Sequence, residues 1–201
     1  MKPLGERSLT IKLPAKLPVL FMAYNVPSYK TIANKKESYA LEVISSILTS
    51  GNSSRITKQL ERQQELVISA SSSYDSFNLY DGLFSLEAIP AVGKSIDQVK
   101  TALVKQLEDL KTTLVTQQEL ERVKAGLIAN KVYEQDSISY QAMVIGMLES
   151  INLSWKDYEN YIESLKKVTP EEIKTTAQKY FTNERLTTAV LEPQEIKTTN
   201  L

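Results

Sequence analysis

The order of the predicted strands and helices along this chain is compatible with few folds. Five segments have strand character, at residues 8–13, 19–26, 66–74, 79–89 and 186–191. Apolar residues at helical spacing separate the first two strands from the second two, and several further helices precede the last strand. Hairpins interrupted by helices predict an α+β fold. We expect a two-layer structure, in which helices pack on one face of an antiparallel sheet.

Capping signals support these helices. Asn34, with Glu37 three residues later, has the form of a capping box, and Gly51 suits the left-handed end of the helix that follows. Thr116 is expected to cap a second helix, and Thr169, with Pro170 at the next position, a third. Two more helices are expected at residues 54–62 and 139–151.

Length and charge limit the classes of protein. A chain of 201 residues suits one domain, with a core at residues 8–193, a linker from a longer protein at 1–7 and a frayed tail at 194–201. The 24 basic and 24 acidic residues give zero net charge, so we expect no nucleic-acid partner. No apolar stretch approaches the ~18 residues of a membrane helix, so no membrane partner is expected.

The chain contains no histidine and no cysteine. This excludes zinc sites built on imidazole pairs, and it excludes thiolate chemistry. Acidic residues on the predicted helices, such as Glu108 and Glu121, are better explained as solvated faces than as a calcium site. The Ser-rich strand at 69–74 leaves a Ser–Lys nucleophile open, although a small-residue strand against a close neighbour is favoured. We therefore assign no catalytic residue and no metal ligand.

Four stretches carry a family resemblance. The run Gly51-Asn52-Ser53-Ser54-Arg55 is followed by a helix end and strand start at residues 60–68, and then by the Ser-rich strand. This path resembles the insulinase or pitrilysin family of zinc metallopeptidases, which includes mitochondrial processing peptidase. Residues 81–84, 116–127 and 168–181 resemble three further motifs of that family, in the same order.

The resemblance implies a role for the whole chain. Family members have two homologous halves: the first holds an inverted H-x-x-E-H zinc site, and the second has no zinc ligands and closes over the substrate. This chain resembles the second half. It is then the non-catalytic half of a zinc metalloendopeptidase, inactive on its own, which encloses an extended peptide. Zinc is expected only in the partner half, on the same polypeptide or a separate subunit. The alternative is a proteolytically silent structural or interaction subunit. The resemblance also implies a periplasmic location.

The resemblance points to particular residues as well. The second half of active members supplies an Arg and a Tyr, seven residues apart, that reach the bound peptide. These positions fall on Glu61 and Ile68, which cannot do this work. Arg62, one residue further, and Tyr74, further along the same strand, are the candidate substrate-binding residues. Regular alternation would place Tyr74 on the same side of the strand as Ile68.

Overall fold

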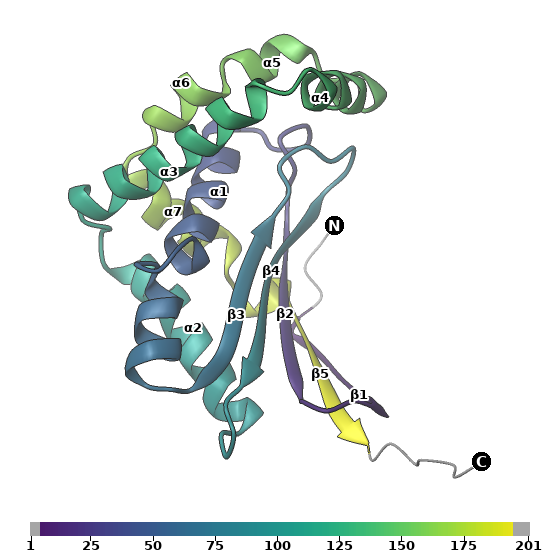
Figure 1. Cartoon of the computed structure of the whole chain (residues 1–201), viewed down its shortest axis with the longest axis vertical. Coiled ribbons are helices and arrows are strands. Elements are labelled where there is room, and N and C mark those ends of the chain that lie inside the picture. Colours follow the sequence, from purple (N-terminus) through teal and green to yellow (C-terminus); the bar gives the residue numbers. More distant parts are fainter. Residues whose placement is uncertain (1–4, 195–201) are drawn as a thin grey trace.

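The computed structural model describes residues 5–194, apart from the side chain of Gln135. Five strands form one sheet in the order β1-β5-β2-β4-β3 (Figure 1). Their bounds are Arg7–Pro14 for β1, Val19–Val26 for β2, Val67–Tyr74 for β3, Gly82–Pro90 for β4 and Leu186–Gln194 for β5. The α+β fold is confirmed. One pairing differs from the expected antiparallel sheet, because β1 and β5 run parallel at one side.

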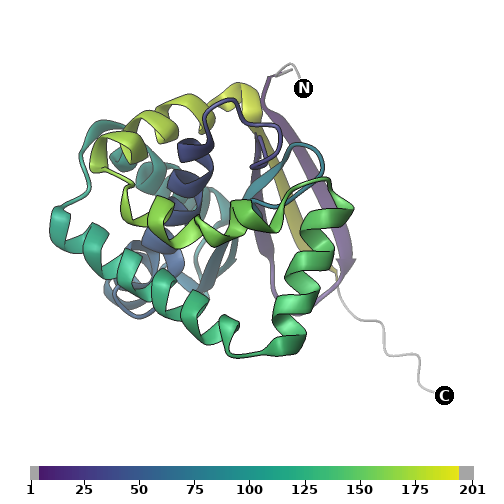
Figure 2. The same cartoon turned by 90° about the horizontal axis from the view of Figure 1, so that it is seen from above.

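Helices α1 (Lys35–Thr49), α2 (Ile96–Thr112) and α7 (Pro170–Tyr180) pack against one face of the sheet (Figures 1 and 2). The remaining helical segments are η1 (Thr57–Gln63), α3 (Gln117–Gln135), α4 (Ile138–Ser150), α5 (Trp155–Glu159), α6 (Tyr161–Lys166) and the short 3₁₀ turn η2 (Asn183–Arg185). Sequence reasoning left α5 and α6 unassigned. It expected an ordinary helix at 54–62, where the structure has the π-helix η1.

The core lies between the sheet and this helix layer. One face of the sheet contributes residues that are almost fully buried, as do the inner sides of α1 and α7. They include Leu20, Met22, Phe84, Leu86, Leu41, Ile44, Ile47, Ile173 and Ala177. Burial of this apolar area is the main favourable term in folding.

The other face, here called the open face, carries no helix within residues 5–194 (Figures 1 and 2). Residues paired in register share a face, which assigns its side chains. Its β1 side is apolar and its β3 side is polar. The apolar part comprises Leu9, Ile11, Leu13, Phe21 and Leu191, and the polar part comprises Ser69, Ser71, Ser73, Ser85 and Glu87.

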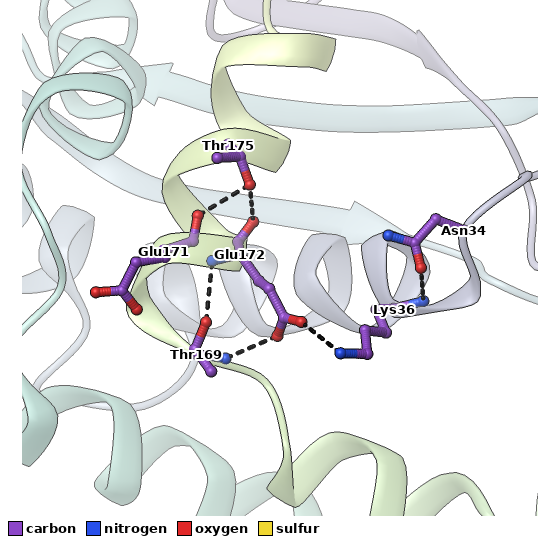
Figure 3. A network of polar contacts seen from close by, with 6 residues as sticks. All are labelled: Asn34, Lys36, Thr169, Glu171, Glu172 and Thr175. Atoms are coloured by element: carbon purple, nitrogen blue, oxygen red, sulfur yellow. Dashed lines mark hydrogen bonds and ion pairs between the residues drawn. The ribbon is translucent and has the colours of Figure 1, made fainter.

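Thr169 caps α7 as predicted, and it does so in a capping box with Glu172 (Figure 3). The Thr169 hydroxyl accepts a hydrogen bond from the Glu172 N–H at 3.1 Å, and the Glu172 carboxylate accepts one from the Thr169 N–H at 3.0 Å. The same carboxylate lies 3.0 Å from the Lys36 ammonium group. The box therefore begins α7 and also joins it to the start of α1.

At Asn34 only half of the expected capping box forms. The Asn34 side chain accepts a hydrogen bond from the Lys36 N–H at 3.2 Å (Figure 3). The Glu37 carboxylate does not close the box, because it accepts hydrogen bonds from the Lys179 ammonium group at 2.7 Å and from the Tyr180 hydroxyl at 2.5 Å. A long-range contact with α7 replaces the local cap.

Residues 1–4 of the predicted linker and 195–201 of the predicted tail lie outside the described residues, whereas Glu6 pairs with Lys100, Arg7 begins β1 and Gln194 ends β5. Within residues 5–194, no helix is long and apolar enough to cross a membrane.

Candidate functional site

The family-like segment begins where α1 ends. Gly51 has a φ of 76°, in the left-handed region that glycine tolerates best. After this turn, the Arg55 guanidinium group binds the Glu119 carboxylate at two points, with Nε to Oε1 at 2.9 Å and Nη2 to Oε2 at 2.8 Å. Glu119 lies in the first turn of α3, and Thr116 caps that helix as predicted. The ion pair therefore joins two of the family-like motifs.

Glu61 has a structural contact of its own. Its carboxylate accepts a hydrogen bond from the Ala70 N–H at 3.1 Å. Two residues further along β3, the Ser72 N–H donates to the Thr49 hydroxyl at 3.1 Å. β3 is an edge strand, and N–H groups on its outer side would otherwise be available to another strand. Side chains from η1 and α1 thus occupy this edge.

Ile68 lies at an irregularity in β3. The pairing register with β4 shifts between Val67 and Ser69, as in a β-bulge. Ile68 is 52% exposed, whereas its neighbour Val67 is buried. The two positions of the family pair therefore carry a carboxylate bound to backbone and an exposed apolar side chain. Neither supplies a hydrogen-bond donor to a peptide.

Tyr74 lies in a different environment from Ile68, because its hydroxyl group contacts other residues of the chain, whereas the Ile68 side chain is exposed. Its hydroxyl donates to the Pro27 carbonyl oxygen at 2.9 Å and lies 3.1 Å from the Ser38 hydroxyl. Burial raises the pKa of this phenol above its ordinary value. Ser38 is fully buried and Pro27 is partly buried, beside the start of α1, which explains Tyr74 as a packing residue.

Arg62 lies in a different part of the structure from Tyr74. It lines an open cleft of about 730 Å³ between η1 and the start of α3, together with Arg55, Lys58 and Arg122. The cleft is next to the turn that follows the C-terminal end of α1, whereas Tyr74 contacts the N-terminal end. A helix of 15 residues is about 22 Å long, so the structure does not bring these two candidates together.

Sequence reasoning missed two features. Lys58 and Arg62 are four residues apart, a spacing that places side chains close together on a helix, but Arg122 joins them only through tertiary packing. A second cavity of about 410 Å³ lies between α4 and α5, lined by Tyr140, Val144, Leu148, Trp155 and Tyr158 among others. Because α5 was not predicted from the sequence, the cavity between α4 and α5 was not predicted either.

No group of three or more Asp or Glu residues within the described chain is placed to hold a metal ion, and the sequence has no histidine to add. The residues present therefore do not fit a zinc site of the kind that the family's catalytic half holds.

Similar folds occur in solved structures. A protease from Helicobacter pylori has 23% identity and a TM-score of 0.87, over 96% of this chain and 46% of that one. The inactive peptidase domain from Bordetella parapertussis has 16% identity and a TM-score of 0.79, over 95% of this chain and 99% of that one. A chain of complex III2 from Candida albicans has 14% identity and a TM-score of 0.74, over 94% of this chain and 46% of that one. This chain thus spans less than half of two of them.

Comparison with curated proteins finds no significant match. A profile of the peptidase M16 inactive domain matches residues 2–127, which include the Gly51 turn, η1, the β3–β4 hairpin and the start of α3. This match covers more than half of the chain and contains three of the four stretches that carry the resemblance. The chain therefore belongs to the insulinase-type M16 peptidase family, as its inactive domain.

Proposed function

We propose that this chain is the non-catalytic half of a zinc metalloendopeptidase, which encloses an extended peptide and positions it for a partner half carrying the H-x-x-E-H zinc site. The open face is the observation that carries this proposal. Its apolar part includes Leu9, Ile11 and Leu13, which are 44%, 43% and 52% exposed. A large apolar patch beside polar residues is typical of an interaction surface. In the proposed role, the open face forms part of the wall of the chamber that encloses the peptide.

The edge of β3 supports a wall rather than a peptide-pairing strand. The outward N–H groups of Ala70 and Ser72 already donate to Glu61 and Thr49. A peptide that adds a strand to a sheet needs such groups free. In this proposal, the peptide pairs with the catalytic half, and this chain limits the space around it.

A reconstitution experiment tests the proposal. The chain and the catalytic half are assayed separately and together with zinc, on a quenched-fluorescence peptide that is unstructured. We expect no zinc binding and no cleavage by this chain alone, and much faster cleavage by the mixture than by the catalytic half alone. Stoichiometric zinc on the isolated chain, or a catalytic half that is equally active without it, would falsify the proposal.

A silent structural subunit is the second candidate. It is favoured by the state of the family pair, because Glu61 is bound to β3 and Ile68 offers no polar group. The fold similarity to a chain of complex III2 is compatible with it. The double variant Glu61→Arg, Ile68→Tyr distinguishes the two candidates, with Glu61→Gln, Ile68→Leu as its control. Faster cleavage by the reconstituted pair with the double variant than with the control favours the role of a peptidase half. The sequence of the partner half is a second test, because a partner without an intact H-x-x-E-H motif favours the silent subunit.

The proposal also places zinc only in the partner half, and names a peptide as the substrate. Nucleic acid and membrane are not partners in it. The periplasmic location belongs to the proposal as well and rests on the family resemblance alone.

A further inference from the structure

The cleft beside Arg62 has an unusual charge for a chain of zero net charge. Four cationic side chains line it, from Arg55, Lys58, Arg62 and Arg122, and the lining carboxylate is that of Glu119. Both carboxylate oxygens of Glu119 are bound by Arg55. This ion pair is neutral as a unit, so the cleft retains three positive charges that no acidic lining residue opposes.

The three remaining cations are not used by the fold as ion pairs. The side chains of Lys58 and Arg62 make no ion pair or hydrogen bond with another residue in the described part of the chain. Arg122 donates to the Ser53 carbonyl oxygen at 2.9 Å, which fixes its position and leaves its charge unopposed. The three residues are exposed and line one cleft, where their like charges repel one another, and an anion in the cleft would relieve that repulsion.

The helix layer adds to this potential. Thr116 and Gln118 of the cleft wall belong to the start of α3, a helix of 19 residues. The positive end of its dipole therefore points toward the same space. The planar guanidinium groups of Arg62 and Arg122 suit carboxylates, which they can bind with two parallel hydrogen bonds.

We infer that this cleft binds an acidic segment of a polypeptide, with Lys58, Arg62 and Arg122 contacting its carboxylates. The inference goes beyond the proposed function, because the cleft lies in the helix layer and not on the open face. The volume of about 730 Å³ exceeds what a single carboxylate fills and falls in the usual range of ligand sites. Several carboxylates on one extended segment match three cations spread over η1 and α3.

Fluorescence anisotropy with the whole chain tests the inference. Three labelled, unstructured peptides of equal length carry Glu, Gln or Lys at the same positions. We expect the Glu peptide to bind about tenfold more tightly than the Gln peptide at low salt, and this difference to shrink as salt screens the charges. Equal binding of the Glu and Gln peptides would overturn the inference.

Variants then locate the site. Arg62→Glu and Lys58→Glu are expected to weaken binding of the Glu peptide by about fivefold each, and Arg62→Gln by less. Lys16→Glu is the matched control, because it makes the same charge change in the exposed turn between β1 and β2. Circular dichroism checks that each variant is folded. A loss that is no larger for Arg62→Glu than for Lys16→Glu contradicts the assignment.

Inorganic phosphate distinguishes carboxylate from phosphate recognition. We expect phosphate to displace the Glu peptide no better than sodium chloride at the same ionic strength. Displacement by phosphate at far lower ionic strength would identify a phosphate site and overturn the inference. The peptidase reconstitution is a separate readout: it can fail while the acidic preference holds, and it can succeed while the preference is absent.

Discussion

Arg55 and Glu119 form a two-point ion pair that joins the turn after α1 to the first turn of α3, and both side chains are only 17% exposed. They are 64 residues apart in sequence. The pair fixes one wall of the basic cleft, because it holds the end of one family-like motif against the start of another. Arg55 also neutralises Glu119, which is the acidic residue in that wall.

We predict that Glu119→Gln lowers the free energy of unfolding by about 1–3 kcal/mol, because the guanidinium group of Arg55 loses its charged partner in a mostly buried position. Urea unfolding at pH 7 measures the change. Glu121→Gln, in the same helix, is the control: Glu121 is 59% exposed and pairs with Lys124 at 3.6 Å, so its effect is expected to stay within about 0.5 kcal/mol. Equal losses for the two variants would show that the Arg55 pair has no special role.

Glu61 is predicted to protect an edge of the sheet. In Glu61→Ala the Ala70 N–H loses its acceptor, which is expected to cost about 1 kcal/mol and to leave the edge of β3 open to another chain. Light scattering after size-exclusion chromatography measures self-association, and urea unfolding measures stability. Glu61→Gln keeps an oxygen acceptor and is expected to resemble the natural protein. Self-association in both variants, or in neither, argues against the capping role.

Tyr74 is predicted to act in stability and not in substrate binding. Tyr74→Phe removes the hydroxyl that binds the Pro27 carbonyl oxygen and the Ser38 hydroxyl, at an expected cost of about 1–2 kcal/mol. Cleavage by the reconstituted pair is expected to change less than twofold when measured well below the melting temperature. A large fall in cleavage with normal stability would restore Tyr74 as a substrate-binding residue.

Glu42 gives a pH-dependent prediction. Burial raises the pKa of its carboxyl group, and opposing contributions from the Tyr161 hydroxyl and the Lys131 charge do not cancel this. One carboxylate oxygen accepts from Tyr161, and the other is buried without a partner within the described residues. Between the ordinary and the raised pKa, the folded state binds more protons than the unfolded state. Stability contributed by this group is therefore present at low pH and lost as pH rises through that window.

Glu42→Gln should remove this contribution, because the amide is neutral at every pH. Urea unfolding at pH 5 and pH 7 is compared for the natural protein and the variant. We expect the variant to gain stability relative to the natural protein at pH 7 more than at pH 5. A larger gain in stability at pH 5 than at pH 7 would mean that the buried carboxylate is stabilised by its surroundings.

Local signals in the sequence predicted most elements of the fold. Thr116 and Thr169 cap α3 and α7 because a hydroxyl acceptor acts on the next few N–H groups, which is a local interaction. The half-formed cap at Asn34 shows the limit of such signals, since Glu37 makes a contact across the fold with Lys179. The parallel pairing of β1 with β5 is likewise invisible in a local pattern, because periodicity gives no partner.

The candidate site was predicted less well. Motif positions identified Glu61 and Ile68 as departures, and the structure places both as unsuited to donate to a peptide. Alternation does not place Ile68 relative to Tyr74, because the irregularity between Val67 and Ser69 interrupts the period of two. The cleft beside Arg62 needed tertiary structure, since its walls come from segments more than 50 residues apart.

The proposed role as a non-catalytic half is best tested by the rate of cleavage by the catalytic half, with and without this chain. Zinc content and the rate on an unstructured peptide are measured for each half alone and for the mixture. We predict zinc in the catalytic half only, no cleavage by this chain alone, and a rate for the mixture well above that of the catalytic half. A catalytic half that is fully active alone, and unaffected by this chain, would contradict the proposed role.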